Sequence, residues 1–307
     1  MIRQYLRRAW RTLLPILYAR SRFRLFLQAA FGDIDLRVQQ LASMTDYFSP
    51  FVRPIPIRAP FGDSMLVVAP HQDDEIIGCG GALALQVRAG RAALVVILQD
   101  GADGHEELRM TREALSTLRN EESRRAIAQL GIEPPLFTGY ADLRTNMSAA
   151  TDALRRMIVD RKVDALFVPW MLDGHPDHRT ANYIVADAIR DLHRNIRVFG
   201  YEVWGLTVPN VIVVIDEVVE QKMAMLYSFS FANKAIDYVQ TTKGLNMYRT
   251  KLLGSGMARY AECFFEAPRT EYVELADRVR VSEDPPVAGK QYFQGAAGDN
   301  DGGSMAF

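Results

Sequence analysis

Two short clusters of histidines and carboxylates are the residues in this sequence best suited to chemistry. The first, His71–Glu75, reads His-Gln-Asp-Asp-Glu and directly follows the apolar run Val67–Pro70. The second, His175–His178, reads His-Pro-Asp-His and comes after the largely apolar stretch 163–169. In open α/β sheets, ligands bind beyond the carboxyl ends of the strands. A catalytic zinc ion uses three imidazole or carboxylate ligands and keeps a fourth position open. The two clusters therefore predict a metal-dependent hydrolase.

The elements that must position these clusters follow from the apolar pattern. Helices are expected at 74–89, 111–130, 148–161 and 180–194, and strands at 64–69, 92–98, 136–140, 163–168, 196–201 and 211–215. After residue 215 the pattern turns helical. Strands that alternate with helices at this spacing predict an α/β fold, a mainly parallel sheet with helices on both faces.

Length and charge divide the chain into three parts. With 307 residues and a net charge of −1, we expect a single domain over 61–285. A basic and aromatic helical extension precedes it at 1–60, and a Gly-rich tail that we expect to be disordered follows at 286–307. The first 32 residues hold seven arginines and no acid, so the remainder is acidic on balance, which argues against nucleic-acid binding. The two cysteines, Cys79 and Cys263, lack metal-ligand spacing and favour a reducing, cytoplasmic compartment.

The basic extension has two interpretations. Its longest apolar run, Leu13–Ala19, is too short to span a bilayer, and no cleavage site for a signal peptide follows it. Arginines interleaved with aromatic and leucine side chains in residues 1–32 suit peripheral binding to the inner face of an anionic membrane. The same pattern suits a helix packed on the protein's own core or docked on a partner protein. The sequence carries no signal for an oligomeric state.

Further motifs make the sequence similar to a known family. They are, in chain order, His71–Glu75, Gly78–Gly81, Arg119–Glu122, His175–His178, Tyr201–Trp204 and Tyr260–Phe264. In this order they resemble the PIG-L/LmbE family of zinc-dependent N-deacetylases. The resemblance covers roughly residues 62–266 and implies a Rossmann-like fold that removes acetyl groups from N-acetylglucosamine-type amines. Gln72 departs from the family, which usually has proline there, and the expected cost is loop rigidity rather than chemistry.

The ligand chemistry can be argued from the residues themselves. His71 and Asp74 are three residues apart at a strand-to-helix junction and can converge on one ion. Pro176 suits a first helical position, which places His175 and His178 at the mouth of a helix, one as a ligand and the other free for catalysis. The resemblance assigns His178 to the metal and His175 to the substrate. We expect one zinc ion per chain, or another divalent transition metal.

The remaining polar residues of the clusters suggest catalytic roles. Asp73 is next to a ligand but is not itself used by the metal, so we expect it to be the general base. Protonated His175 would stabilise the tetrahedral oxyanion or protonate the leaving amine, and both duties stay open. Asp177 would hold His175 in its charged form and orientation.

Two residues outside the clusters are candidates for substrate binding. Arg119 suits a sugar or phosphate clamp by resemblance, although it can equally pair with Glu121 or Glu122. His105 is in the loop after the strand expected at 92–98 and should border the site, or it is a surface histidine. The glycines at 78, 80 and 81 lack the spacing of a phosphate-binding loop and favour close helix-to-sheet packing.

The function expected from these residues is hydrolysis of the acetamide of an N-acetylated sugar in a glycan, glycolipid or small-molecule conjugate. One alternative is a zinc amidase or esterase that acts on a non-sugar acyl group. Another is a catalytically silent relative that uses the fold as a scaffold. Because every ligand, acid and base position is filled, the scaffold is disfavoured.

Overall fold

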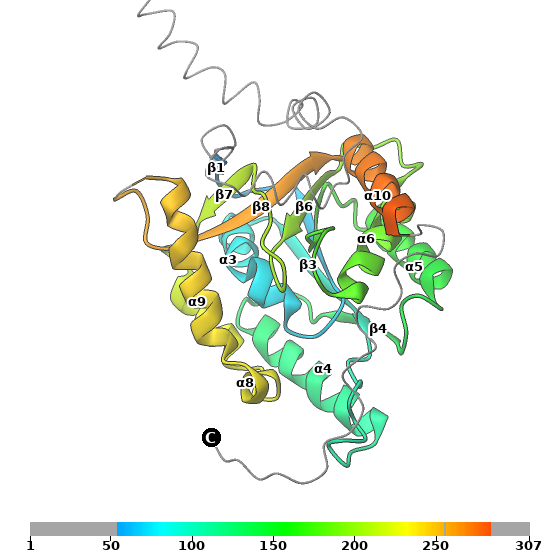
Figure 1. The fold of residues 1–307 in the computed structure, drawn as a ribbon. Helices are drawn as coiled ribbons and strands as arrows, with labels where there is room; N and C mark the ends of the chain where they lie inside the picture. The colour runs from blue at the N-terminus through cyan, green and yellow to red at the C-terminus, as the bar shows by residue number, and fades with distance from the viewer. Residues whose placement is uncertain (1–53, 255, 284–307) are drawn as a thin grey trace, which may run out of the picture.

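The computed structural model of the chain describes residues 54–254 and 256–283. These residues form one eight-stranded sheet with helices on both of its faces (Figure 1), which confirms the expected α/β fold. The expectations for residues 1–32 and for the tail at 286–307 lie outside the described residues. The strands are β1 Ile55–Ile57, β2 Ser64–Ala69, β3 Ala92–Gln99, β4 Leu136–Tyr140, β5 Ala165–Pro169, β6 Arg197–Tyr201, β7 Val211–Val214 and β8 Ala261–Pro268.

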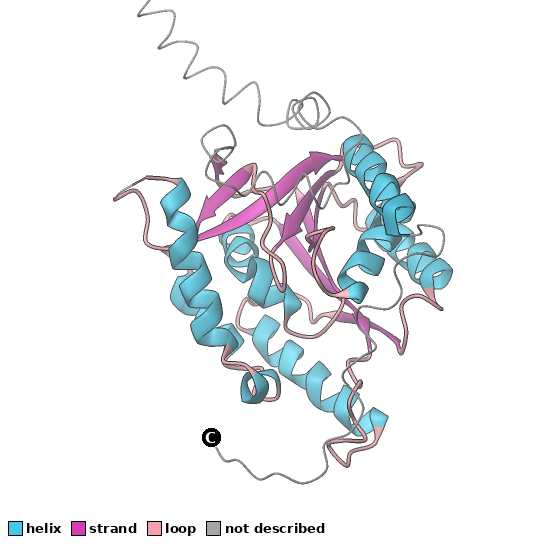
Figure 2. Cartoon of the chain, in the orientation of Figure 1, coloured by secondary structure: helices cyan, strands magenta, loops and turns pink. Residues whose placement is uncertain are grey.

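The helices form two layers that enclose the sheet (Figure 2). Successive strand residues point to opposite faces, so Met65 and Val67 join one apolar core while Leu66 and Val68 join the other. The first core is completed by α3 Asp74–Arg88, α4 Arg112–Ala128, α7 Val219–Leu226 and α9 Tyr238–Arg249. The second is completed by α5 Met147–Asp160, α6 Pro176–Ile189 and α10 Arg269–Glu283. The short elements α8 Ala232–Ala235 and η1 Thr250–Leu252 flank α9. None of the helices in the described ranges has the length and apolar character needed to cross a membrane.

The order of the strands creates a crevice at the centre of the sheet. The order is β1-β7-β8-β6-β5-β2-β3-β4, and β8 alone runs antiparallel to its neighbours within the described sheet. The chain moves outward from β2 through β3 to β4 and then returns to place β5 on the other side of β2. Ligand sites of open α/β sheets lie at such a reversal, beyond the carboxyl ends of the strands. The first histidine cluster begins two residues after β2, and the second begins six residues after β5.

Some elements differ from the sequence-based expectations. β8 lies where only helix was expected, and it pairs with both β6 and β7. β1 lies within the residues assigned to the extension, yet it pairs with β7 at the edge of the sheet. Helix α6 begins at Pro176 and ends at Ile189, earlier at both ends than the expected 180–194. The other expected strands and helices are present with ends shifted by no more than a few residues.

Helix α3 carries the first cluster and packs unusually close to the sheet. A β-carbon at Gly78 would lie 2.0 Å from the Tyr201 ring, and Tyr201 donates a hydrogen bond to the Val68 carbonyl. The helix is kinked at Cys79, and the freed backbone N–H groups of residues 81 and 82 donate to Glu262. Gly78 therefore allows the helix to pack closely on the sheet, as the sequence predicts.

Candidate active site

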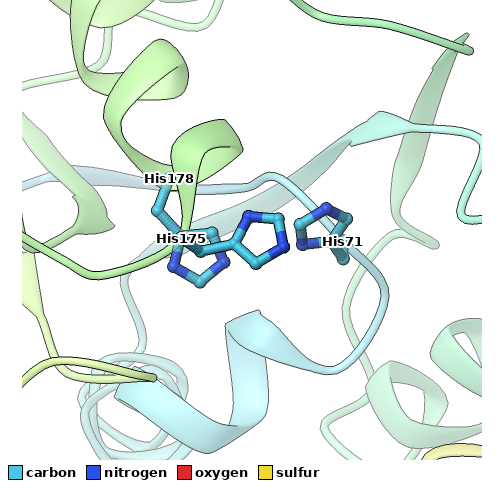
Figure 3. Close-up of side chains that lie close together, drawn as sticks. All are labelled: His71, His175 and His178. Carbon is cyan, nitrogen blue, oxygen red and sulfur yellow. The ribbon is translucent and has the colours of Figure 1, made fainter. Parts of the chain in front are cut away.

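The two clusters meet at the crevice between β2 and β5. His71 lies in the turn after β2, and His175 and His178 lie at the start of α6. Figure 3 shows the three imidazole rings gathered together. Each ring offers a nitrogen within 4.8 Å of the nitrogens offered by the other two. The structure thus brings together residues more than a hundred positions apart, and the histidine cluster is suited to holding a metal ion.

Asp74 lies closer to the nitrogens of His71 and His178 than the spacing of the three-histidine cluster requires, so it suits the third ligand position better than His175 does. Its Oδ2 atom lies 3.3 Å from Nδ1 of His71 and 3.3 Å from Nε2 of His178. For metal–ligand bonds of about 2.0–2.1 Å, the ligand atoms of a tetrahedral zinc site are roughly 3.3–3.4 Å apart. Both ring nitrogens of His178 are buried, and within the described chain neither makes a regular hydrogen bond, although each lies beside a carboxylate oxygen. These atoms have the spacing and chemistry that a zinc ion requires.

A carboxylate lies at the outer nitrogen of each of these two histidines. Asp177 Oδ2 is 3.3 Å from Nε2 of His71, and Asp173 Oδ1 is 3.1 Å from Nδ1 of His178. Burial raises the pKa values of both carboxyl groups, but their contacts with the histidines outweigh it and hold them below the usual value. Ligand histidines typically contact a carboxylate in this way, which fixes the ring and its tautomer.

Asp177 was expected to orient His175, and its position is different. It lies closer to His71, at 3.3 Å, than to Nδ1 of His175, at 3.7 Å. Moreover, Nδ1 of His175 caps α6 by accepting a hydrogen bond from the Asp177 backbone N–H. Asp177 therefore acts mainly on His71, because the turn of the helix points its side chain across the crevice.

The charge expected on His175 does not suit this geometry. A nitrogen that accepts a backbone N–H cannot carry a proton itself, so the ring proton of His175 belongs on Nε2. Burial, followed by the positive charges of His71 and His178, lowers the pKa of His175 below its usual value. The geometry therefore leaves Nε2 as the ring nitrogen of His175 that can donate a hydrogen bond.

The ligand residues are strongly coupled electrostatically. Burial lowers the pKa of His71, but the contacts with Asp177 and Asp74 outweigh burial and raise the pKa above its usual value, to about 9. Burial likewise opposes the effect of Asp74 and Asp173 on His178, whose pKa rises to about 10. The pKa of Asp74 is held far below its usual value despite burial, because both histidines contact it. The carboxyl group of Asp74 is thus ionised and suited to binding a cation.

Asp73, the expected base, is in a different environment from its neighbour. Its backbone has φ 109°, in a region that residues with a side chain rarely adopt, and such conformations cluster at functional sites. It precedes α3 yet makes no side-chain capping hydrogen bond. Burial raises its pKa to about 7, although Arg119 opposes the shift. A carboxyl group with a pKa near neutrality is well matched to proton transfer.

Glu75 holds the backbone of Asp73 in place through a hydrogen bond. Its carboxylate accepts hydrogen bonds from the Asp73 backbone N–H and from Ser123 on α4. The side chain is fully buried, and this burial raises the pKa of Glu75 to about 8. The third acid of the cluster therefore fixes the strained turn and is not available to a metal.

The two candidate substrate residues have different positions. Arg119 donates to the backbone carbonyls of Gln72 and Gly101, and its guanidinium is 3.5 Å from Asp73. It pairs with neither neighbouring glutamate in the described contacts, but it lines the cavity at the site. His105 contacts the Ala102 carbonyl within its own loop and is not among the residues lining the cavity.

Gln72 compensates for the proline that the family usually has. Its side chain is fully buried and donates to Asn120 on α4 at 2.7 Å and to the Asp100 carbonyl at 3.2 Å. Hydrogen bonds therefore hold the turn where a proline ring would restrict it, and the expected loss of rigidity is offset.

The cavity beside the histidines has a volume of about 210 Å³. Within the described chain it is lined by the predicted residues His71, Asp73, Asp74, Arg119, His175 and Asp177, and by Gln99, Gly101, Asp103, Trp204 and Tyr238. Trp204 and Tyr238 were not predicted as site residues, and neither was Asp173. Trp204 belongs to a motif of the sequence resemblance, Tyr201–Trp204.

One segment of the chain matches the model of a known protein family. Residues 66–189 match the model of the family described as PIG-L, GlcNAc-PI de-N-acetylase. Through this segment, the chain is similar to the PIG-L/LmbE family. The match ends at the last residue of α6 and so contains both histidine clusters, Asp73 and Arg119.

Individual proteins resemble the chain in sequence or in fold. Diacetylchitobiose deacetylase of Thermococcus kodakarensis is 28% identical over 167 residues, which are 52% of this chain and 59% of that protein. N,N′-diacetylchitobiose deacetylase of Pyrococcus horikoshii has a similar fold, with a TM-score of 0.60 at 20% identity over 79% of this chain and 97% of that chain. GalB of Pseudomonas putida, a 4-carboxy-2-hydroxymuconate hydratase, also shares the fold, with a TM-score of 0.54 at 22% identity over 67% and 96%. A protein named as a hydratase thus shares this fold with proteins named as deacetylases.

Proposed function

We propose that the protein is a zinc-dependent N-deacetylase that hydrolyses the acetamide of an N-acetylglucosamine-type sugar. The observation that carries the proposal is the spacing of Asp74 Oδ2, 3.3 Å from a ring nitrogen of both His71 and His178, beside the separate carboxyl group of Asp73. The three ligand atoms suit a single zinc ion, and they leave Asp73 free as a base.

The ligands proposed for zinc are Nδ1 of His71, Oδ2 of Asp74 and Nε2 of His178. When bound, such an ion polarises a carbonyl oxygen and lowers the pKa of water toward neutrality. Asp177 and Asp173 keep the far nitrogens of the two rings protonated, which directs the lone pairs at the ligand positions inward.

Asp73 accepts the proton of the attacking water in this proposal. Its pKa of about 7 leaves a useful fraction ionised at neutral pH and makes the protonated form a competent donor later in the reaction. Arg119 holds the turn through the Gln72 carbonyl and keeps Asp73 oriented. Asp73 can therefore return its proton to the amine that leaves.

His175 is proposed to stabilise the developing oxyanion. Its Nδ1 is fixed by the cap of α6, so Nε2–H is the donor available on a ring that lines the cavity. A neutral imidazole with a fixed donor provides such a hydrogen bond without reorganisation as the charge develops.

The relatives support the acetamide as the substrate group, because proteins named as deacetylases match both in sequence and in fold. The hydratase with the same fold shows why activity must be measured directly. A zinc amidase or esterase for a non-sugar acyl group would use the same ligands and base.

The experiment is a screen for release of free amine. The full-length zinc-loaded protein is incubated with N-acetylglucosamine glycosides, N-acetylated sugar-lipids and non-sugar acetamides, with the Asp73→Asn variant as the matched control. We expect amine from at least one N-acetylated sugar, and a loss of about 10²-fold or more in the variant. Release from non-sugar acetamides alone, or equal rates in the two proteins, would contradict the proposal.

A further inference from the structure

A buried ion pair contacts helix α3 at its kink, one turn after the proposed catalytic carboxylates. Lys222 on α7 and Glu262 on β8 lie 2.7 Å apart, and both side chains are buried. Neither residue is a proposed metal ligand, and neither lines the cavity at the histidines. Burial of two charges costs solvation and brings little net stability, so the position of this pair requires another explanation.

The pair binds backbone groups on both sides of the kink in α3. In a regular α-helix the N–H of Gly81 would donate to the carbonyl of Ile77, four residues earlier. Here the N–H groups of Gly81 and Ala82 donate to the two oxygens of Glu262, each at 2.7 Å. Lys222 Nζ donates to the Ile77 carbonyl at 2.9 Å. The two charged groups thus satisfy backbone groups at the break, which two apolar side chains could not do.

The glycines after the kink leave room for the pair. A β-carbon at Gly81 would lie 2.8 Å from Oε1 of Glu262, and one at Gly80 would lie 3.3 Å from Cγ of Lys222. Both separations are below the roughly 3.5 Å of an ordinary non-bonded contact. Asn246 on α9 accepts a further hydrogen bond from Lys222 Nζ at 3.1 Å. Three elements that are distant in sequence, α7, α9 and β8, therefore meet at this one point of α3.

The helical turn before the kink connects the pair to the active site. Ile77 donates its N–H to the Asp73 carbonyl at 2.9 Å, and the carbonyl of Ile77 is the one that Lys222 binds. Asp74 is the first residue of the same turn, so the direction of the turn determines where its carboxylate lies relative to the two ligand histidines. After the kink, α3 packs its apolar side chains into the first core. A kink allows the two parts of a helix to point in different directions.

We propose that Lys222 and Glu262 are a positioning pair for the active site. By binding both sides of the break, they set the direction of the turn that carries Asp73 and Asp74, and with it the geometry of the metal ligand and the base. This inference rests on the proposed function, because it uses the roles given there to the two aspartates. Opposite charges suit this task, since hydrogen bonds to charged groups are shorter and stronger than those between neutral groups.

The test compares the same substitution at two buried glutamates of β8. Glu262→Gln retains the shape of the side chain, but its amide has one acceptor oxygen where two N–H groups each need one. Glu266→Gln is the matched control, because that side chain is buried on the same strand and pairs with Arg197 on β6. In full-length protein, urea denaturation measures stability and competition with a chromophoric chelator measures zinc affinity. The visible absorption of the cobalt(II)-substituted protein reports the geometry of the ligands.

We expect Glu262→Gln to bind zinc at least about tenfold more weakly than the unmodified chain, the lower end of the effect of losing an outer partner of a metal ligand. Its cobalt spectrum should change as well. At saturating zinc, kcat for a substrate from the amine-release screen should fall about 10²-fold, the cost of a displacement of about 1 Å. Glu266→Gln should keep the zinc affinity, spectrum and kcat of the unmodified chain, even where urea denaturation shows a similar loss of stability.

Two results would overturn the inference. The first is a folded Glu262→Gln variant whose zinc affinity is within twofold of the unmodified chain and whose cobalt spectrum is unchanged. The second is an equal loss of zinc affinity in Glu266→Gln, which would mean that any loosening of the core around β8 weakens the site.

If Glu262→Gln does not fold, the double variant Lys222→Met/Glu262→Gln takes its place. It leaves no unpaired charge, and replacement of a buried ion pair by neutral side chains of similar volume is often neutral in stability. Methionine has no donor for the Ile77 carbonyl, so the same losses are expected, and an unchanged zinc affinity would again overturn the inference. The proposed function fails separately. If the unmodified protein releases no amine but its zinc affinity still depends on Glu262, then the reaction is wrong and the positioning pair stands.

Discussion

Replacement of Asp173 by asparagine should weaken zinc binding although Asp173 is not itself a proposed ligand. One oxygen of Asp173 contacts His178 Nδ1 at 3.1 Å and accepts the His175 backbone N–H, and the other accepts two N–H groups of the Trp204 loop. An asparagine side chain has one oxygen and one NH2 group, so it must lose the acceptor on one side.

The magnitude follows from these contacts. If the amide NH2 faces His178, then the ring no longer has a carboxylate to keep Nδ1 protonated, and the lone pair at Nε2 is no longer fixed. If it faces the loop, two buried N–H groups lose their acceptor, which costs about 1–3 kcal/mol for each. Loss of such an outer partner typically reduces metal affinity about 10–100-fold.

The assay is competition for zinc with a chromophoric chelator at fixed pH. Asp191→Asn is the matched control. The Asp191 side chain is 74% exposed, and its ion-pair partner, at 3.7 Å, is Arg155 and not a histidine of the site. We expect the Asp173 variant to bind zinc 10–100-fold more weakly than the unmodified chain, with Asp191→Asn unchanged. Affinities within twofold of each other in all three proteins would refute the reasoning.

Three further predictions test other parts of the account. His178→Ala should lose zinc while His175→Ala retains it and loses rate; metal analysis and turnover give both readouts, and zinc lost from His175→Ala alone would reverse the assignment. Zinc affinity should rise between about pH 6.5 and 8.5, with about two protons released per ion. Ligand histidines bind metal deprotonated, and the pKa values of metal-free His71 and His178 are about 9 and about 10. Calorimetry in buffers of different ionisation enthalpy measures the proton release, and a release near zero would contradict this prediction. Lys222→Met should lower the free energy of unfolding by about 3–5 kcal/mol because it leaves the carboxylate of Glu262 buried without its cation; urea denaturation tests this, and a loss under about 1 kcal/mol would count against it.

The central part of the fold could be predicted from the sequence because its strands are buried on both faces. Ser64–Ala69, which is buried throughout, matches the expected strand at both ends. A strand buried on both faces reads as a continuous apolar run, which needs no knowledge of its neighbours. The sharp change from such a run to His-Gln-Asp-Asp-Glu likewise marked the site.

The strand β8 could not be predicted in the same way, because its apolar run is interrupted by Glu262 and Glu266. Both glutamates are buried, and each has a cation from a distant element, Lys222 on α7 and Arg197 on β6. Only the folded chain shows that these charges are paired. A local pattern therefore cannot identify the strand.

The contacts of Asp173 and Asp177 with the histidines could not be predicted from the sequence for a related reason. Asp177 contacts His71, which is 106 residues away, and Asp173 contacts a histidine on the opposite side of the turn that begins α6. Sequence proximity associated Asp177 with His175, whereas the direction of the first helical turn brings it to His71. The residue types were thus predictable, but the pairs depend on side-chain direction.

The most direct test of the account is the zinc content of Asp74→Asn beside that of Asp73→Asn. The two residues are adjacent and receive the same substitution, yet the structure gives Asp74 the contacts with His71 and His178 and gives Asp73 the position beside Arg119. We predict that Asp74→Asn is isolated with little zinc, and that Asp73→Asn retains about one ion per chain and loses turnover about 10²-fold or more. Full zinc content in Asp74→Asn, or loss of zinc from Asp73→Asn, would contradict the proposed site.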